Sequence, residues 1–532
     1  MNGKTLIPSA VALLLLGCNP WDNLPLDGWS WLEDPLWDDE VVAATDGLYV
    51  RLPHAGALMR ITTAGETSTV DLGDAEPVSM ALGPDLDTIV LFQQWDDCDT
   101  DDPDVETLSD CPEDDLVTHH ELSLIRDGQV VGENGPVDVP GHYNRLEFSP
   151  WSEDSGTDPV AVAYLDYEGG GIDVEGVLNL TEVLFVNLRT GATAPVSVGF
   201  SANNVLFTAD GTKAAVLSRS QVVVVDLTSA DYDVLVTYHL TLDADQEVDP
   251  LGAAITPDDR YLLMSVENSG DLYAMDLDNE SINIVDLDAS PAAMAVDSYA
   301  DRTALVYGSR AQVDLLEHDY FDVETVELDE PCNAIAETDA GFAVLYNESA
   351  STHDVYLLDI ETGDLTEYRL ANPVMSLQLT EDQTYAVALL RQEWDDSSSG
   401  IDAEYDEHWG MSLIDLTDDD NIDLMLGSQP VGLALAEDAA GEPFALLLLE
   451  GVDTIVQVNL WGATTEEIAL PAPPTGIGAM PDGLFYITHQ ASLGLVSFLE
   501  PGAQKLTRSV SGFAGEGLFT DDELPEGSEG GE

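Results

Sequence analysis

Hydrophobic residues along the chain gather in short runs, separated by turns that are rich in Gly, Asp, Asn and Pro. Runs of about four to eight residues that favour Val, Leu, Ile and Tyr are typical of β-strands. No stretch keeps an apolar period of 3.6 residues over the dozen or so positions that an amphipathic helix needs. The pattern therefore predicts an all-β protein from about residue 40 to residue 519.

One strand pattern recurs along this region. A strand ends in Asp or Asn followed by Leu or Ile, at Asn187, Asp226, Asp276, Asp359, Asp415 and Asn459, which are 39, 50, 83, 56 and 44 residues apart. The longest interval contains a degenerate copy near Leu316. An Asp-rich turn, as in Pro481-Asp482-Gly483, precedes another strand of the unit. A four-stranded unit that recurs at this spacing predicts a β-propeller, because one small twisted sheet cannot bury both faces and a ring of sheets can.

The two ends of this region indicate how the ring closes. Residues 41–51 resemble the third and fourth strands of a unit, and residues 493–510 resemble a first and a second strand. We therefore expect the N- and C-terminal strands to complete one blade together, which removes an open edge. The repeats number about seven to ten, whereas most propellers have about four to eight blades. A single large ring, a smaller ring and two rings all remain open.

The repeated turns also carry a family resemblance. The turn with Asp359, Thr362 and Gly363, and the Pro-Asp-Gly turn, resemble the repeats of bacterial propellers of the YVTN and WD40-like type. The resemblance implies the fold but says little about activity, because propellers host many unrelated functions.

The N-terminus predicts the location of the protein. Lys4 is followed by an apolar run over residues 5–16, which is too short to span a bilayer as a helix and is typical of a signal peptide. Its Leu-Leu-Gly-Cys ending resembles the lipobox of bacterial lipoproteins, which implies removal of residues 1–17 and lipidation of Cys18. An ordinary secretory signal is the alternative. Asn19 favours the outer membrane, so we expect a protein of the bacterial cell envelope that touches the membrane through its lipid alone.

Two segments flank the expected propeller at residues 40–519. Residues 18–39 form a Trp-rich tether with Trp21, Trp29, Trp31 and Trp37. These rings either dock on the ring or contact lipid headgroups, where Trp is favoured. Residues 520–532 have the composition of a disordered acidic tail.

The charge balance restricts the partners. The chain has 103 acidic and 15 basic residues, for a net charge of -88. Such a surface repels nucleic acid, whose binding depends on Lys and Arg. The composition resembles that of proteins from salt-adapted organisms, in which salt screens the repulsion between carboxylates. A function that depends on the acids themselves, with cations as ligands, is the alternative.

The cysteines predict one disulfide. Cys98 and Cys111 lie thirteen residues apart in an acidic loop, and a secreted protein enters an oxidising compartment. A bridge between them would contribute roughly 3 kcal/mol. Cys332 is left over and is expected to be a buried thiol.

The same acidic loop is a candidate calcium site. Its candidate ligands are Asp97, Asp99, Asp101, Asp102 and Asp104, and the alternation of the first three suits oxygen coordination of Ca²⁺. The sixth position is Asp102, where an EF-hand needs Gly, so the loop is not an EF-hand. A solvated loop held by the disulfide is the alternative.

Two loops are candidates for ligand binding. Trp95 begins one, and Trp394, Asp395 and Asp396 begin the other, which ends at Trp409. Both open with Trp-Asp-Asp after a strand, which indicates equivalent places in two units. Aromatic rings beside carboxylates suit a sugar or a cationic peptide, whereas insertions without a function are the alternative.

These features predict a lipid-anchored propeller that acts as a binding or scaffold module for a protein or glycan. One alternative is a hydrolase that resembles the propeller lactonases, with a divalent metal in the central channel. Its ligands would come from distant blades, so we assign no catalytic residue. A calcium-dependent structural protein of the envelope is the other alternative. The sequence contains no nucleophile elbow, phosphate loop or dinucleotide motif.

Overall fold

The computed structural model describes residues 41–513, except 53–55, 74, 99–110, 113–115, 132–134, 140–142, 144, 152–155, 166–180, 220, 241–249, 267–268, 298–300, 339, 350–351, 393–407, 419 and 492–493. Its regular elements are 41 β-strands, and the described residues contain no helix. Accordingly, they include no helix long and apolar enough to cross a membrane.

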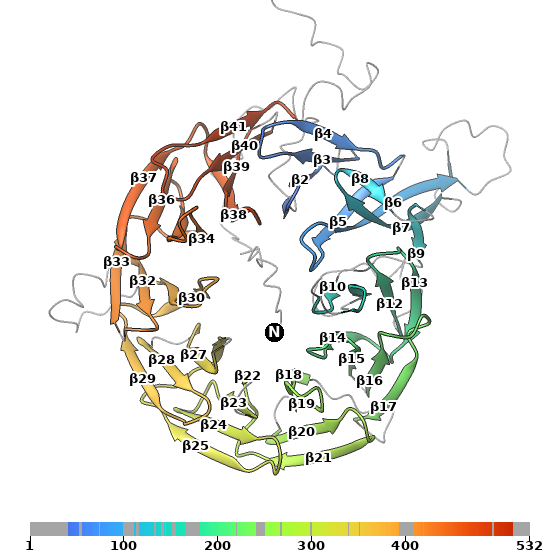
Figure 1. The fold of residues 1–532 in the computed structure, drawn as a ribbon, viewed down its shortest axis with the longest axis vertical. Coiled ribbons are helices and arrows are strands. Elements are labelled where there is room, and N and C mark those ends of the chain that lie inside the picture. The colour runs from blue at the N-terminus through green and yellow to red at the C-terminus, as the bar shows by residue number, and fades with distance from the viewer. Residues whose placement is uncertain are drawn as a thin grey trace, which may run out of the picture.

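The strands form ten antiparallel sheets, which stand as ten blades around a central axis (Figure 1). Nine sheets have four strands, and the second has a fifth. Each blade uses consecutive strands, with the first nearest the axis and the fourth at the rim. The predicted all-β propeller is confirmed, as a single ring at the upper end of the predicted blade count.

Blades 1 to 5 follow one another along the chain. Blade 1 contains β1 Val41–Ala44, β2 Gly47–Leu52, β3 Ala57–Ile61 and β4 Thr67–Val70; blade 2 contains β5 Glu76–Leu82, β6 Ile89–Cys98, β7 Leu116–Arg126, β8 Gln129–Val131 and β9 Val137–Val139; blade 3 contains β10 Arg145–Phe148, β11 Val160–Tyr164, β12 Glu182–Asn187 and β13 Thr193–Ser197; blade 4 contains β14 Ala202–Phe207, β15 Lys213–Ser218, β16 Gln221–Asp226 and β17 Val234–His239; blade 5 contains β18 Pro250–Ile255, β19 Tyr261–Val266, β20 Asp271–Asp276 and β21 Ser281–Asp286. In blade 2, β9 pairs with β7 beside β8, so the outer strand of that sheet is split in two.

Blades 6 to 10 complete the ring. Blade 6 contains β22 Ala293–Val296, β23 Arg302–Val306, β24 Gln312–Glu317 and β25 Val323–Glu327; blade 7 contains β26 Ala334–Glu337, β27 Phe342–Tyr346, β28 Asp354–Asp359 and β29 Leu365–Arg369; blade 8 contains β30 Val374–Leu379, β31 Tyr385–Leu390, β32 Trp409–Asp415 and β33 Asp420–Leu426; blade 9 contains β34 Pro430–Glu437, β35 Pro443–Leu449, β36 Thr454–Asn459 and β37 Thr464–Ala469; blade 10 contains β38 Pro474–Ala479, β39 Phe485–His489, β40 Leu495–Leu499 and β41 Arg508–Ser511.

The ring closes where the ends of the propeller chain meet, but the expected sharing of one blade is wrong. Residues 41–51 form the first and second strands of blade 1, and residues 495–511 form the third and fourth strands of blade 10. The strand that ends in Asp-Leu is the third of its blade, whereas the sequence pattern predicts it as the first strand of its unit. The predicted boundaries between units therefore lie two strands away from the boundaries between blades. Closure comes from side-chain packing, in which Leu48 and Val50 join Val496 and Phe498 in one buried cluster.

The hydrophobic core is divided into ten clusters, one between each pair of neighbouring blades. Successive residues of a strand point to opposite faces of its sheet, so each middle strand contributes to two clusters. This explains why the second and third strands are almost continuously apolar. In β35, for example, every residue from Pro443 to Leu449 is buried.

The recurring Asp-Leu pair builds the turn between the third and fourth strands. In blade 7, Asp359 Oδ1 accepts the backbone N–H of Thr362 at 2.9 Å, and Gly363 takes the φ of 75° that favours glycine. The N–H of Ile360 donates to the carbonyl of Gly341 at 3.1 Å, and the Ile360 side chain is buried. The degenerate copy in blade 6 has the buried His318 at this position.

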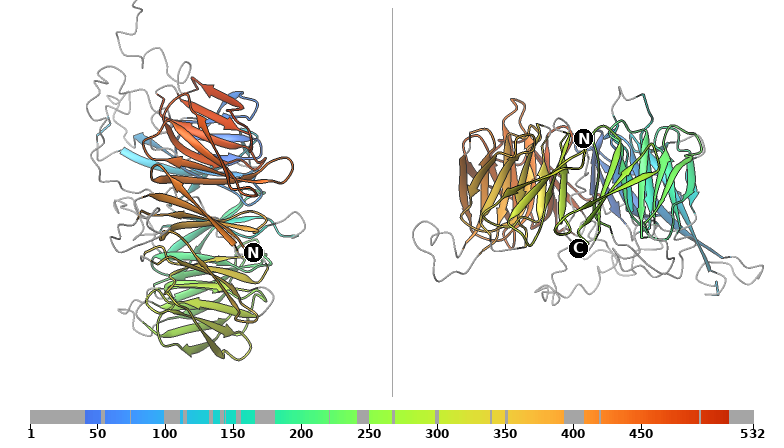
Figure 2. Two further views of the ribbon diagram at one scale, coloured as in Figure 1. Left: turned by 90° about the vertical axis from the view of Figure 1, so that its left-hand side faces the viewer. Right: turned by 90° about the horizontal axis from the view of Figure 1, so that it is seen from below.

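The connections divide the ring into two faces. Strands run roughly along the axis, as Figure 2 shows, so turns between first and second or third and fourth strands share one face, here called the turn face. Connections between second and third strands, and between blades, share the other, here called the loop face. The three longest connections, β6 to β7, β11 to β12 and β31 to β32, all belong to the loop face.

Candidate functional site

A cavity of about 500 Å³ opens on the loop face between blades 8 and 9. This volume falls within the usual range of about 300–1,000 Å³ for small-molecule sites. Its lining combines an indole, an imidazole, planar amides, a hydroxyl and a carboxylate, contributed by Gln392, His408, Trp409, Leu426, Gly427, Ser428, Gln429, Glu450 and Gly451. We call these residues the blade 8/9 groove.

Trp409 is held at the wall of the groove formed by blade 8. It is the first residue of β32 and lies opposite Leu426, the last residue of β33. Part of its side chain packs on the core between blades 8 and 9, while the residue remains partly exposed. Before it, the carbonyl of His408 accepts a hydrogen bond of 2.8 Å from Nδ2 of the buried Asn372. The start of β32 is therefore fixed.

The opposite wall comes from blade 9 and the connection that leads into it. The backbone N–H of Glu450 donates to the carbonyl of Gln429 at 2.8 Å, which joins two segments of the wall. Glu450 is exposed, and Ser428 and Gln429 are partly exposed. Their side chains can therefore meet a ligand while the backbone keeps its place.

The chemistry of the groove suits binding. Gln429 carries two amide donors and a carbonyl acceptor, and Ser428 adds a hydroxyl. Glu450 is the one carboxylate in the lining, which contains no Lys or Arg. A phosphate or sulfate group would lack the cationic partners that usually bind it. The groove is thus matched to a neutral or cationic ligand with a flat apolar face and several hydroxyl or amide groups.

Trp95 lies in a different setting. The strands β6 and β7 continue past the rest of blade 2 as a two-stranded arm (Figure 1), and near its base the rings of Trp95 and His119 stack with centroids 4.1 Å apart. Cys98 and Cys111 are joined by a disulfide at the arm, with Cα atoms 5.8 Å apart. The Oδ1 of Asp97 accepts the N–H of Cys98 at 2.8 Å.

The two predicted binding loops do not form one site. Both connect the second and third strands of their blades, but β6 of blade 2 and β32 of blade 8 lie on opposite sides of the ring (Figure 1). Trp95 and Trp409 are therefore separate surfaces. The candidate residues Cys18, Asp99, Asp101, Asp102, Asp104, Trp394, Asp395 and Asp396 lie outside the described residues.

No cluster of three His, Cys, Asp or Glu side chains suited to a metal ion occurs within the described ranges. The calcium site in the acidic loop stays a prediction, because Asp97 is the one proposed ligand that the structure describes. Cys332 is buried, and burial raises the pKa of its thiol to about 12, with Asp354 adding to the effect.

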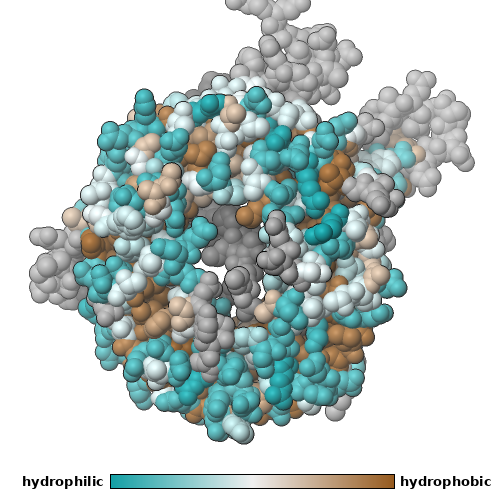
Figure 3. Space-filling model, viewed as in Figure 1, coloured by the Kyte–Doolittle hydropathy of each residue, from teal (hydrophilic) through white to brown (hydrophobic). Residues whose placement is uncertain are grey.

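The central opening is bordered by the first strands of the blades, and the face drawn in Figure 3 is largely hydrophilic around it. Four carboxylates stand on these strands, at Glu76, Glu147, Glu337 and Glu437. Burial raises the pKa of Glu147, and burial together with Asp382 raises that of Glu437. Glu337 accepts the N–H of Val296 from the neighbouring blade at 3.1 Å. These acids belong to blades 2, 3, 7 and 9, and no candidate metal cluster in the described part of the chain includes them.

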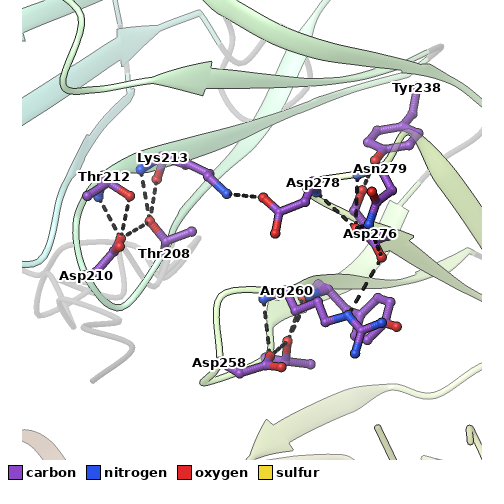
Figure 4. Close-up of polar contacts among 12 residues, drawn as sticks. Thr208, Asp210, Thr212, Lys213, Tyr238, Asp258, Arg260, Asp276, Asp278 and Asn279 are labelled. Atoms are coloured by element: carbon purple, nitrogen blue, oxygen red, sulfur yellow. Dashed lines mark hydrogen bonds and ion pairs between the residues drawn. The ribbon is translucent and has the colours of Figure 1, made fainter. Parts of the chain in front are cut away.

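Many of the other Asp and Glu side chains accept hydrogen bonds in turns or form ion pairs between blades. Figure 4 shows the contact between blades 4 and 5, where Lys213 Nζ pairs with Asp278 at 2.7 Å. Burial acts to raise the pKa of Asp210, but hydrogen bonds from Thr212 and Thr208 outweigh it and hold the pKa below its usual value. This use of carboxylates is structural.

The candidate residues from the sequence include Trp409 of this groove but not Gln392, Ser428, Gln429 or Glu450. Each lies beside a strand end in a different connection, and only the packing of blade 9 on blade 8 brings them together. The spacing of these residues carries no signal of that contact.

Comparison with known proteins does not assign the chain to a protein family. No protein-family model matches the chain, and no curated protein matches it. Among solved structures, similar chains include hydrazine synthase of Kuenenia stuttgartiensis, with 12% identity, a TM-score of 0.33 and coverage of 56% of this chain and 95% of that one. The dihydro-heme d1 dehydrogenase NirN in complex with DHE shows 12% identity, a TM-score of 0.38 and coverage of 62% and 71%. The β-propeller domain of Cps50 (Swd1) from Myceliophteria thermophila shows 13% identity, a TM-score of 0.29 and coverage of 56% and 96%.

Proposed function

We propose that the protein is a lipid-anchored β-propeller of the bacterial cell envelope that binds a glycan or protein ligand on its loop face. The observation that carries the binding role is the blade 8/9 groove, a concave surface with an aromatic ring and several hydrogen-bonding side chains on a fixed backbone. Rigid scaffolds that carry variable loops commonly place recognition on those loops. The anchor would be Cys18, with the ring held outside the membrane.

The net charge of -88 limits the ligands further. It repels anionic polymers at low salt, so nucleic acid is an unsuitable partner. A neutral or cationic ligand meets no such barrier. The first alternative from the sequence, a hydrolase with a divalent metal in the central channel, receives no specific support from the described residues.

Anchoring is tested by producing the full chain in a bacterium grown with a radiolabelled fatty acid. The wild type is expected to carry the label and to sediment with membranes. The Cys18→Ser variant is expected to lose the label and to be released. A labelled Cys18→Ser protein would overturn the anchor.

Binding is tested with the detergent-purified full chain carrying a photo-crosslinking residue in place of Ser428, mixed with whole cell envelopes. Crosslinking to a glycan or a protein at this position supports the loop-face site. If the same crosslinker captures envelope material only from the turn face, at the position of Trp461, the proposed site is wrong.

A further inference from the structure

We infer that the ligand of the blade 8/9 groove is an oligosaccharide of neutral or amino sugars, which stacks one sugar ring on the indole of Trp409. This inference rests on the proposed function and names the ligand class of its site. The cavity is open on the loop face, and its volume of about 500 Å³ has room for a short oligosaccharide.

Trp409 provides an aromatic platform. It is the one large aromatic side chain in the lining, and its partial burial against the core between blades 8 and 9 holds the indole in place. A preorganised ring loses little conformational freedom when a ligand stacks on it. The C–H face of a pyranose is apolar and flat, so it can cover the exposed part of the indole.

Polar groups surround this indole. Gln429 and Ser428 offer donors and acceptors without net charge, and Glu450 offers a carboxylate acceptor. The hydroxyl groups on the edge of a sugar are both donors and acceptors, so one ring can satisfy several of these side chains. The mixture of amides and acceptors therefore favours hydroxyl-rich ligands over apolar ones.

The charge of the groove restricts the sugars that can bind. The lining contains Glu450 and no Lys or Arg, and the whole chain is strongly acidic. Sulfated, phosphorylated or carboxylated sugars would bring a negative charge to a carboxylate with no guanidinium or ammonium beside it. The groove should therefore select neutral or amino sugars against acidic ones.

The experiment uses the full chain in detergent on a glycan array that contains neutral, amino, carboxylated and sulfated oligosaccharides, at low and high sodium chloride. Titration calorimetry follows on the best neutral glycan. We expect neutral or amino glycans to bind and acidic glycans to fail at both salt concentrations. If acidic glycans bind best at high salt, where repulsion is screened, the inference is overturned.

Variants then locate the site. Trp409→Ala is expected to weaken binding at least tenfold, and Trp409→Phe to weaken it only a few-fold because the flat ring remains. Trp461→Ala is the matched control, since Trp461 is 58% exposed on blade 9, which forms the other wall of the groove, but lies on the turn face. It should bind like the wild type. Equal binding by Trp409→Ala and wild type would overturn the inference.

Loss of binding in Trp409→Ala could arise from a folding defect. Gln429→Ala distinguishes the two causes, because it removes a partly exposed amide and leaves the core intact. We expect this variant to melt like the wild type and to bind several-fold more weakly, whereas unchanged binding would contradict the inference. If the crosslinker at Ser428 captures a protein and no glycan binds, the glycan inference fails while the proposed binding role stands. If neither is captured, both fail.

Discussion

At the residue scale, the abundance of Asp has a structural explanation in the turns. In the turn between the first and second strands of blade 8, Asp382 accepts hydrogen bonds from the hydroxyl of Thr380 at 2.7 Å and from the N–H of Thr384 at 3.1 Å. Equivalent Thr-x-Asp turns occur at Thr208 and Thr256. These carboxylates replace backbone partners that a tight turn leaves unpaired.

Replacing Asp382 with Ala should therefore destabilise the protein by about 1 kcal/mol, because two or more hydrogen bonds to a charged acceptor are lost. Glu467→Ala is the control, since Glu467 is exposed on the outer strand β37. Thermal melts of both variants, followed by circular dichroism, provide the measurement. Equal shifts in the two variants would show that Asp382 is ordinary surface charge.

A second residue-scale prediction concerns pH. His489 is buried, with Nδ1 donating to the carbonyl of Ala472 at 3.0 Å and Nε2 accepting from Ser497 Oγ at 2.9 Å. Burial lowers the pKa of His489, although the hydrogen bond to Ala472 opposes it. The unfolded chain thus binds this proton more readily, so the contribution of His489 is complete above its unfolded pKa of about 6.5 and declines below it.

The apparent melting temperature should accordingly decline less steeply from pH 7 to pH 5 in His489→Gln than in the wild type. The variant itself is expected to be less stable at pH 7, because its amide cannot reproduce both hydrogen bonds. His408→Gln is the control, since His408 is exposed. A pH profile of His489→Gln parallel to that of the wild type would refute this account of the buried histidine.

At the scale of elements, the sequence predicts the strands well and their grouping less well. Short apolar runs bounded by Asp and Gly identify strands such as β20 and β28, because both faces of these strands are buried between blades. The start of a blade, however, is invisible in a continuous repeat. A unit that begins at the Asp-Leu strand and a unit that begins two strands later have the same sequence period. Only the packing between blades shows which of the two units is the blade.

The arm formed by β6 and β7 gives an element-scale prediction. Because it extends past the rest of blade 2, opening it leaves the buried clusters around that blade in place. The Cys98→Ala/Cys111→Ala double variant should raise hydrogen exchange at residues 93–98 and 116–121. The melting temperature of the ring should change by only a degree or two.

Peptide mapping without reductant should also recover Cys98 linked to Cys111 and Cys332 as a free thiol. A fall in melting temperature of many degrees in the double variant would mean that the arm unfolds together with the ring. Unchanged exchange at the arm would mean that the disulfide does not hold it.

At the scale of the whole molecule, ten blades share one ring and a net charge of -88. At 0.1 M salt the Debye length is about 10 Å, and at 1 M it is about 3 Å. Added sodium chloride should therefore stabilise the ring by screening repulsion between carboxylates. Calcium chloride of equal ionic strength should raise the melting temperature by a similar amount. A chelator should then change the melting temperature only as far as it changes the ionic strength.

A rise specific to calcium, at concentrations far too low to screen charge, would instead support a preformed cation site. The acidic loop that includes Asp97 would then be the first candidate. That outcome favours the calcium-dependent structural protein over a metal-free binding propeller.

The central claim is that a ligand from the envelope occupies the blade 8/9 groove. Its most direct test is hydrogen–deuterium exchange of the full chain in detergent, with and without a neutral polysaccharide fraction of the envelope. The account predicts slower exchange at residues 408–411 and 426–429 and at 450–452, and unchanged exchange at the turn-face residues 460–463. Protection confined to the β6–β7 arm or to the turn face, with none at the groove, would contradict it.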